Sequence, residues 1–273
     1  MIKGTFPIEK FRELETPFYY YDLKVLRDTL DTIKKEAGKY ENFHVHYAIK
    51  ANANPKVLRV IREAGLGADC VSGGEVAAAL KAGVPASKIV FAGVGKTDKE
   101  IALALDAGIF CFNAESVPEL EAIEALAAER GVVAQVALRI NPNVGAHTHS
   151  NITTGLAENK FGIGYEQLDD VINVVDGLEH VKLIGLHFHI GSQITRVNEV
   201  FSLECLRVNE IVKYFEERGL RIDNINLGGG LGVDYDDPDG TPVADFKTWF
   251  ETIASNIIRR PDQAVHVEPG RSL

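Results

Sequence analysis

In this 273-residue sequence, a lysine and a pair of histidines lie near the ends of segments that are expected to form strands. Lys50 follows the largely apolar and aromatic run 46–49. A lysine that is desolvated at the end of a buried strand has a lowered pKa and can form a Schiff base with an aldehyde. The same lysine could instead extend its ammonium group into solvent, as strand-end lysines often do.

His187 and His189 flank Phe188, so in a strand both imidazoles point to the same face. Two imidazoles on one face suggest a metal-dependent hydrolase as one alternative. A zinc site needs a third ligand, and none is nearby in the sequence. Each histidine can equally be a core residue that is hydrogen-bonded to a neighbour.

A glycine cluster and a Glu-Arg pair make up the remaining reactive stretches. Gly228, Gly229 and Gly230 follow an apolar run, and consecutive glycines let backbone N–H groups approach an anion such as phosphate. A simple turn is the alternative for this cluster. Glu268 ends the sequence's last apolar run and Arg271 follows three residues later, where they are either a solvated ion pair or groups beside the candidate phosphate loop.

Eight short apolar runs alternate with amphipathic segments, which is the pattern of repeated βα units. The expected strands are 44–50, 68–71, 89–92, 110–112, 134–140, 183–190, 225–227 and 265–268. Eight parallel strands predict an α/β fold of the (β/α)8 barrel type. In such a barrel the carboxyl ends of the strands meet at one pole, so the reactive stretches are expected to converge there.

The first part of the chain does not fit this repeat. We expect residues 1–43 to form an N-terminal strand (18–21) and a helix (23–39) that lead into a barrel domain spanning 44–273. Residues 141–165 form the longest stretch without helical or strand periodicity. Loops of this length are more often functional than not.

Composition narrows the class of partner. The formal net charge of −10 argues against nucleic acid and anionic membranes, so a small-molecule substrate is expected. No apolar run approaches the roughly 20 residues of a membrane span, and the N-terminus does not read as a secretory signal. Three widely spaced cysteines without a CxxC pattern predict reduced thiols, and we expect a cytoplasmic protein.

Taken together and in this order, these motifs resemble the fold-type III pyridoxal-phosphate-dependent decarboxylases, and within them the diaminopimelate decarboxylases. The resemblance extends over residues 16–273. It rests on YAIKAN (47–52), DCVSGGE (69–75), GVGKT (93–97), NKFG (159–162), HFHIGSQ (187–193), GGGLG (228–232) and EPGRSL (268–273). Each motif alone is weakly specific, whereas seven in register are strongly so.

The resemblance implies pyridoxal 5'-phosphate as the cofactor and an alanine racemase-like barrel as the fold. It implies catalytic roles for Lys50, which bonds the cofactor covalently, for His189, which stacks on the pyridine ring, and for Glu268, which meets the pyridine nitrogen. Ser192 and the backbone of Gly228, Gly229 and Gly230 are expected to bind the phosphate. Gly270 and Arg271 are expected beside the phosphate, and Arg271 also at the substrate carboxylate. Asp69 and Arg139 are expected to line the cofactor cleft.

The implied reaction is the decarboxylation of meso-2,6-diaminopimelate to L-lysine. A carboxylate at Glu268 favours a protonated pyridine nitrogen, and a protonated ring is the stronger electron sink. The similar alanine racemases place an arginine there, so Glu268 favours decarboxylation over racemisation. Decarboxylases of ornithine, arginine or carboxynorspermidine, and a pyridoxal-phosphate-binding protein without turnover, remain as alternatives.

The resemblance also implies a following β domain that supplies substrate contacts and a proton-donating cysteine, often across a homodimer interface. The sequence ends at Leu273, and Cys70, Cys111 and Cys205 do not match that cysteine's motif. We therefore expect a chain that lacks the C-terminal β domain, is inactive alone and forms a homodimer when full length.

Overall fold

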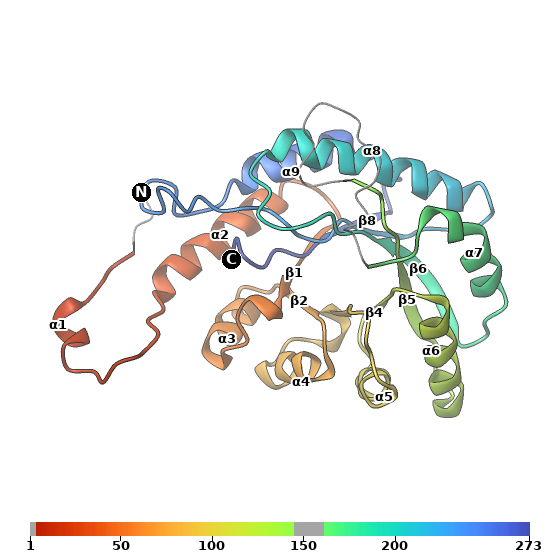
Figure 1. The fold of residues 1–273 in the computed structure, drawn as a ribbon, viewed down its shortest axis with the longest axis horizontal. Coiled ribbons are helices and arrows are strands. Elements are labelled where there is room, and N and C mark those ends of the chain that lie inside the picture. Colours follow the sequence, from red (N-terminus) through yellow and green to blue (C-terminus); the bar gives the residue numbers. More distant parts are fainter. Residues whose placement is uncertain (1–3, 145–160) are drawn as a thin grey trace.

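Eight parallel strands close into a barrel in chain order, with β8 pairing back onto β1. The computed structural model describes residues 4–144 and 161–273 (Figure 1). The strands are β1 (Phe43–Ala48), β2 (Gly67–Cys70), β3 (Ile89–Phe91), β4 (Cys111–Ala114), β5 (Ala134–Arg139), β6 (Val181–His187), β7 (Asn224–Asn226) and β8 (Ala264–Val267). The predicted (β/α)8 barrel is confirmed, and each of the eight expected strands overlaps an observed one.

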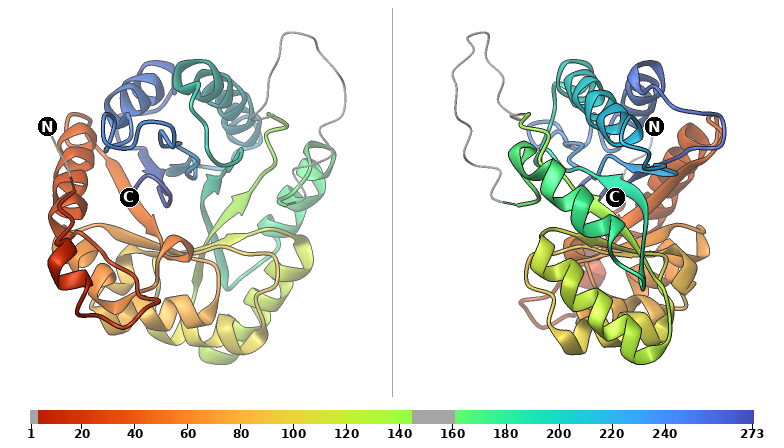
Figure 2. Two further views of the ribbon diagram at one scale, coloured as in Figure 1. Left: turned by 60° about the vertical axis from the view of Figure 1, so that its left-hand side comes forward. Right: turned by 90° about the vertical axis from the view of Figure 1, so that its right-hand side faces the viewer.

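Helices surround the barrel on its outer side (Figure 2). They are α2 (Leu23–Ala37), α3 (Pro55–Glu63), α4 (Gly73–Ala82), α5 (Asp98–Ala107), α6 (Val117–Arg130), α7 (Leu168–Asp176), α8 (Val197–Glu216) and α9 (Phe246–Asn256). The short helix α1 (Ile8–Phe11) precedes them and buries no residue. The described residues also form three short 3-10 turns, η1 (Ile49–Ala51), η2 (Ala86–Lys88) and η3 (Tyr165–Gln167). None of the described helices is both long and apolar enough to cross a membrane.

Local signals in the sequence explain where these helices begin and end. Thr97 and Glu100 form a reciprocal capping box at the start of α5. Ser116 accepts a hydrogen bond from the Glu119 N–H at the start of α6. A side-chain cap of this kind is worth about 1 kcal/mol. Gly83 ends α4 in the left-handed conformation at a φ of 87°, which glycine adopts without strain.

The interior of the barrel contains many polar side chains. The main hydrophobic core lies between the helices and the outer face of the strands, whereas a small second cluster consists of Val90, Cys111, Ala137 and Ile184. Buried polar side chains accompany this second cluster, namely His46, Asp69, Asn113, His187, Asn226, His266 and Glu268. Buried polar groups need partners, so the barrel interior must be organised by hydrogen bonds.

The predicted N-terminal strand is wrong. Residues 18–21 have no strand assignment, and Tyr19 is 90% exposed. The segment around α1 extends away from the barrel (Figure 1). Because β1 and β8 pair with each other, the described barrel leaves no open edge to which another strand could add. The helix expected over 23–39 is confirmed as α2.

Strands β1, β6 and β8 end earlier than the sequence predicted, so three candidate site residues lie just beyond them. Lys50 lies in η1 rather than in β1, His189 lies two residues beyond β6, and Glu268 follows directly after β8. Most of the expected functional loop 141–165 lies outside the described residues. The NK pair of the NKFG motif (159–160) lies outside them as well.

Candidate active site

A cavity of about 540 Å³ opens at the carboxyl ends of the barrel strands. Its lining includes nearly all of the predicted site residues: Lys50, Asp69, Arg139, His189, Ser192, Gly229, Gly230, Glu268, Gly270 and Arg271. Gly228 is the predicted site residue that does not line it. All seven motifs therefore contribute residues to the lining, the NKFG motif through Phe161.

Glu268 lies at the base of the cavity, where three other strands supply its hydrogen-bond donors. Asn226 of β7 donates to Oε1 at 2.6 Å, and Asn113 of β4 makes a longer contact of 3.4 Å to the same atom. His187 of β6 lies with Nε2 at 2.9 Å from Oε2. Burial raises the pKa of Glu268, and the hydrogen bond from Asn226 acts against this rise. The carboxylate is thus held rigidly in a dry environment, where a cationic partner would stabilise it strongly.

Both histidines of the HFHIGSQ motif are neutral. Burial, followed by the nearby positive charge of Arg139, lowers the pKa of His187 to about 3. Burial and the charge of Lys50 lower the pKa of His189 to about 3 in the same way. A neutral His187 with its proton on Nε2 donates to Glu268, which leaves Nδ1 as an acceptor. That Nδ1 has no hydrogen-bond partner in the described structure.

Lys50 reaches over the cavity toward Asp69. Its Nζ lies 3.8 Å from Oδ2 of Asp69, and the lysine side chain is 54% exposed whereas the aspartate is 1% exposed. The desolvated lysine that the sequence predicted is therefore not found, because η1 lifts Lys50 out of the strand. Burial, and then the negative charge of Glu268, raise the pKa of Asp69 to about 7.

Arg139, at the end of β5, is held by a carboxylate that the sequence did not single out. Its Nη1 donates to Oε1 of Glu115 at 2.8 Å, and the same oxygen accepts the N–H of Gly93 at 2.8 Å. The Arg139 guanidinium lies 5.5 Å from the centre of the Phe161 ring. These contacts fix the wall of the cavity and leave Oε2 of Glu115 without a partner.

The glycine loop after β7 packs too closely for any side chain. A Cβ at Gly229 would lie 2.1 Å from the carbonyl oxygen of Glu268, and one at Gly228 would lie 2.4 Å from that of Phe188. The Gly228 N–H donates to Oδ1 of Asn226 at 2.9 Å, so Gly228 shapes the loop instead of facing the cavity. The Gly229 N–H donates to Nδ1 of His189 at 3.3 Å, which sets the orientation of that ring.

A rim of polar groups completes the cavity beside this loop. Arg271 donates from Nη1 to the hydroxyl of Tyr235 and lies 3.4 Å from Oγ of Ser192 through Nη2. Both Arg271 and Ser192 are exposed, so these contacts are readily exchanged for a ligand. A guanidinium, a hydroxyl and glycine backbone at one rim are the groups that phosphate and carboxylate select.

Other reactive side chains are engaged elsewhere. Lys96 of the GVGKT motif is buried, and its Nζ donates to the carbonyl oxygens of Gly93 and Asn113 and to Glu119. This lysine therefore has a structural role. Cys70, Cys111 and Cys205 are free, buried and absent from the cavity lining, and burial raises the pKa of all three thiols.

Sequence reasoning missed three residues that organise the site: Asn113, Glu115 and Asn226. Asn226 was visible as a polar residue directly before the glycine loop, and Asn113 as a polar residue inside an apolar run. A polar side chain in an expected buried strand is a usable signal, because burial without a partner is costly. Nothing in the local pattern, however, pairs either asparagine with Glu268.

The cavity fits the expected cofactor. Its volume lies within the roughly 300 to 1,000 Å³ of small-molecule sites. Three cavity-lining residues carry a buried acceptor atom without a hydrogen-bond partner, namely Asp69 Oδ1, Glu115 Oε2 and His187 Nδ1. Unpartnered buried acceptors indicate that a polar ligand completes the site. Lys50 supplies an amine for an aldehyde, and the Arg271 rim suits a phosphate.

The alternative of a metal-dependent hydrolase gains no support from this geometry. Among residues 4–144 and 161–273, no group of three or more His, Cys, Asp or Glu side chains is arranged to hold a metal ion. His187 instead uses its Nε2 to contact Glu268. Both histidines are held by hydrogen bonds within this cavity, His187 with Glu268 and His189 with the N–H of Gly229.

The chain matches the family model described as "Pyridoxal-dependent decarboxylase, pyridoxal binding domain" over residues 24–273. Over 272 residues it is 60% identical to a diaminopimelate decarboxylase of Bacteroides thetaiotaomicron, covering 100% of this chain and 70% of that protein. A diaminopimelate decarboxylase of Neisseria meningitidis is 38% identical over 258 residues, covering 94% of this chain and 62% of that protein.

Two solved structures of diaminopimelate decarboxylases superpose closely on this chain. A crystal structure of diaminopimelate decarboxylase from M. jannaschii superposes with a TM-score of 0.89 at 37% identity, covering 98% of this chain and 63% of that chain. The Helicobacter pylori enzyme complexed with L-lysine superposes with a TM-score of 0.82 at 34% identity, covering 97% and 66%. The chain thus spans about two thirds of the length of these relatives. It belongs to the pyridoxal-dependent decarboxylases, and within them to the diaminopimelate decarboxylase family, of which it contains the pyridoxal-phosphate-binding barrel.

Proposed function

We propose that this barrel serves a diaminopimelate decarboxylase, which removes CO2 from the D-configured carbon of meso-2,6-diaminopimelate and leaves L-lysine. The observation that carries the proposal is the position of Glu268, held by Asn226 and His187 at the base of a cavity whose rim carries Lys50. When bound, pyridoxal phosphate supplies a conjugated cationic ring that delocalises the electron pair left by the departing carboxyl group.

Glu268 would hold a proton at the ring nitrogen of the cofactor. A buried carboxylate favours a cation beside it far more than water does, because little solvent competes for the charge. Asn226 and His187 direct the carboxylate, and neither carries a positive charge that would compensate it. This arrangement supports decarboxylation over racemisation, since it strengthens the electron sink.

Lys50 and His189 would contact the cofactor itself. Lys50 has an exposed amine that can bond the cofactor's aldehyde carbon, and Asp69 below it can keep the amine oriented. His189 is neutral and is positioned by the Gly229 N–H, so its ring can lie flat against a planar cofactor without adding charge. Arg271, Ser192 and the glycine loop would take the phosphate, and Arg271 also the substrate carboxylate.

The substrate is proposed from the relatives. The most similar ones reported above are diaminopimelate decarboxylases, and the H. pylori protein was crystallised with L-lysine. Ornithine, arginine and carboxynorspermidine are the competing substrates. Turnover of all four compounds by the full-length enzyme tests the assignment. A kcat/KM for diaminopimelate at least about 100-fold above the others is expected, and a preference for one of the other three would refute it.

We also propose a homodimeric, cytoplasmic enzyme at full length. Three buried, unpaired thiols are compatible with a reducing compartment. The resemblance to a family that completes its site across a subunit interface supports the dimer. Size-exclusion chromatography with light scattering on the full-length protein should give twice the monomer mass.

A further inference from the structure

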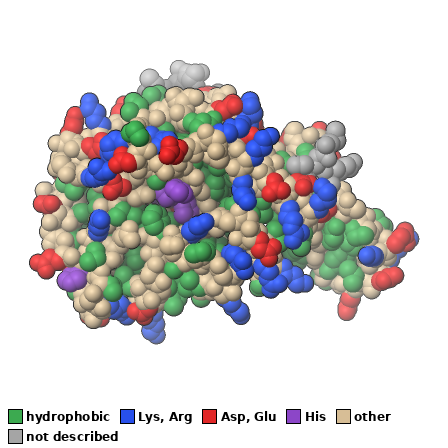
Figure 3. Space-filling view, turned by 180° about the vertical axis from the view of Figure 1, so that it is seen from behind, with side chains coloured by type: hydrophobic (Ala, Val, Ile, Leu, Met, Phe, Trp, Pro, Cys, Tyr) green, Lys and Arg blue, Asp and Glu red, His purple; other side chains and the backbone are tan. Residues whose placement is uncertain are grey.

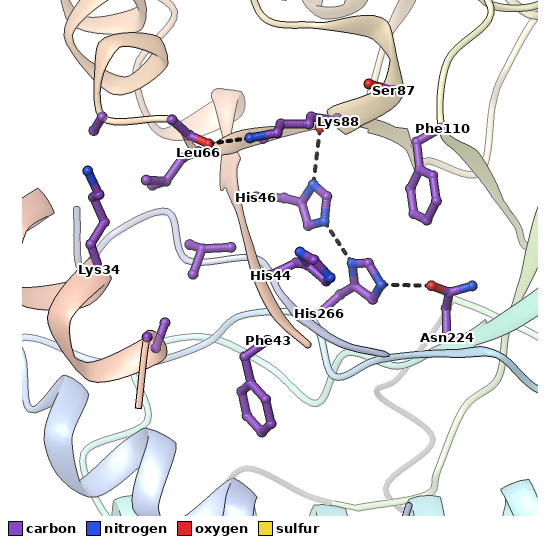
Figure 4. A pocket seen from close by; sticks show the side chains of 16 residues that line it. Lys34, Phe43, His44, His46, Leu66, Ser87, Lys88, Phe110, Asn224 and His266 are labelled. Atoms are coloured by element: carbon purple, nitrogen blue, oxygen red, sulfur yellow. Dashed lines mark hydrogen bonds between the residues drawn. The ribbon is translucent and has the colours of Figure 1, made fainter. Parts of the chain in front are cut away.

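A second cavity opens at the opposite pole of the barrel, where the strands begin. Its volume is about 490 Å³, and its lining shares no residue with the cavity described above. Figure 3 shows histidine side chains at the centre of one face, among apolar side chains and near lysine or arginine. Figure 4 shows the interior of the cavity, with His44, His46 and His266 at its centre. We call it the N-terminal cavity.

The charges that line the N-terminal cavity select an anion. Lys34 and Lys88 line it, and none of the lining residues is acidic. The lining is thus positive although the whole chain has a formal net charge of −10. The Lys88 ammonium donates to the carbonyl oxygen of Gly65 at 2.8 Å, whereas Lys34 lies exposed on the last turn of α2.

Its rings favour a flat ligand. His266 lies with its ring centre 4.9 Å from that of His44, 5.2 Å from that of His46 and 5.5 Å from that of Phe110. The angles between these ring planes are 29°, 25° and 26°, so the four rings are nearly parallel. Nearly parallel rings present planar faces on which another aromatic ring can stack.

The chain of hydrogen-bond contacts through His46 and His266 has one proton too few when both rings are neutral. A chain of contacts runs from the Lys88 carbonyl oxygen to His46 Nδ1 (3.2 Å), from His46 Nε2 to His266 Nδ1 (2.9 Å), and from His266 Nε2 to Asn224 Oδ1 (3.0 Å) (Figure 4). Both ends of the chain can only accept. Three contacts therefore need three ring protons, and two neutral imidazoles carry two.

Rotating the Asn224 amide does not supply the missing proton. The rotation would turn Nδ2 toward His266 and Oδ1 toward the carbonyl oxygen of Ile184. That carbonyl oxygen accepts from Asn224 Nδ2 at 2.9 Å, so the rotation replaces one acceptor–acceptor contact with another. The deficit is removed when the His46–His266 pair binds one additional proton.

The surroundings explain why the pair is neutral without a ligand. Burial lowers the pKa of His46 to about 4 and lowers the pKa of His266 well below its usual value. The charged and titratable groups that act on the pair are His44, Lys88 and Glu268, and Lys34 lines the same cavity. Glu268 is the acidic group among these, and it acts from inside the barrel on His46. An anion in the cavity would add the missing negative charge directly beside the pair.

We propose that the N-terminal cavity binds a small aromatic carboxylate, and that the His46–His266 pair takes up one proton when it binds. The carboxylate would contact Lys34 and Lys88 and would be attracted by the positive charge of the protonated pair, whose ring N–H groups stay in the chain of contacts. The ring of the ligand would lie along the nearly parallel aromatic rings. This inference does not depend on the proposed function, because the two cavities share no residue.

Calorimetric titration with benzoate tests the proposal. At about pH 6, in buffers with different heats of ionisation, binding should take up most of one proton per benzoate, because a rise of the pair's pKa from about 4 to about 7 is then sufficient. Benzamide, which is flat but uncharged, and cyclohexanecarboxylate, which is charged but not flat, should each bind at least about 10-fold more weakly. Lys34→Gln should weaken benzoate binding about 3- to 10-fold, while Lys35→Gln, on the same helix outside the cavity, should leave it unchanged.

His266→Asn should abolish the proton uptake. Because His266 is buried and its replacement can impair folding, Lys34→Gln at the rim remains as an independent test. The proposal is overturned if benzoate does not bind up to about 10 mM, the range of weak fragment binding, or if it binds without proton uptake. Unchanged affinity in Lys34→Gln would place the benzoate elsewhere and would equally overturn it.

Discussion

Replacing Asp69 with asparagine should remove a large pH dependence of stability. Its carboxyl group is 1% exposed, and burial with the negative charge of Glu268 raises the pKa of Asp69 from 3.8 to about 7. A shift of about 3 pKa units corresponds to a cost on the order of 4 kcal/mol for the ionised form in the folded state. This cost is comparable to a large part of the stability of an ordinary domain.

The sign follows from proton binding in the two states. Below pH 3.8, Asp69 is protonated in both the folded and the unfolded chain and has no effect on stability. Between there and about pH 7 the unfolded chain releases the proton while the folded chain keeps it, so the free energy of unfolding falls as the pH rises. Asparagine is neutral throughout. Asp69→Asn should therefore be more stable than the wild type by several kcal/mol at about pH 8 and similar to it near pH 4.

Urea unfolding without added cofactor, followed by circular dichroism across this pH range, measures the difference. Asp31→Asn, at an exposed position of α2, is the matched control and should follow the wild type at every pH. Glu268 also has a raised pKa and contributes to the curves of both proteins. The test is therefore the difference between the free energies of unfolding of the wild type and the variant at each pH. Parallel curves for the wild type and Asp69→Asn would show that Asp69 ionises normally and would refute the reasoning.

Three further predictions concern the cofactor site. Borohydride reduction with added pyridoxal phosphate, followed by peptide mapping, should label Lys50, and a label on Lys96 or Lys160 instead would contradict the assignment. Glu268→Gln in the full-length enzyme should leave cofactor binding largely intact but lower kcat about 100- to 1,000-fold, corresponding to about 3 to 4 kcal/mol of barrier, and an unchanged kcat would exclude a role at the ring nitrogen. The 273-residue chain alone should bind pyridoxal phosphate, seen by absorbance, yet turn over diaminopimelate negligibly, because the family places further substrate contacts and an acid outside the barrel; activity within tenfold of a full-length homologue would argue against this.

The alternation of strands and helices could be predicted from sequence because its signals are local. The caps at Thr97 and Ser116 and the glycine stop at Gly83 determine where helices begin and end. Apolar periodicity marks the stripe that each helix buries. Residues 18–21 show the limit of this reasoning, because an aromatic run forms a strand only where a sheet edge is free to pair with it. Closure of β1 onto β8 removes that edge.

The composition of the site could be predicted only in part. Lys50, Glu268 and the glycine loop lie in distinctive motifs, and the cavity brings them together as expected. The hydrogen-bond partners of Glu268 are 42, 81 and 155 residues away in sequence, and no local pattern pairs them with it. Which inward-facing side chains meet at the same height depends on the register of the closed barrel.

The sequence by itself therefore determined the fold class, the order of the elements and the chemical identity of the groups at the barrel mouth, because periodicity, caps and strand-end residues act over a few positions. Only the tertiary structure decided that Lys50 is exposed on a 3-10 turn, that Asp69 and Glu268 share a dry interior, and that His46 and His266 join into one hydrogen-bonded pair. Burial and long-range contacts set charge states, and both arise only when eight distant strands close around a common axis.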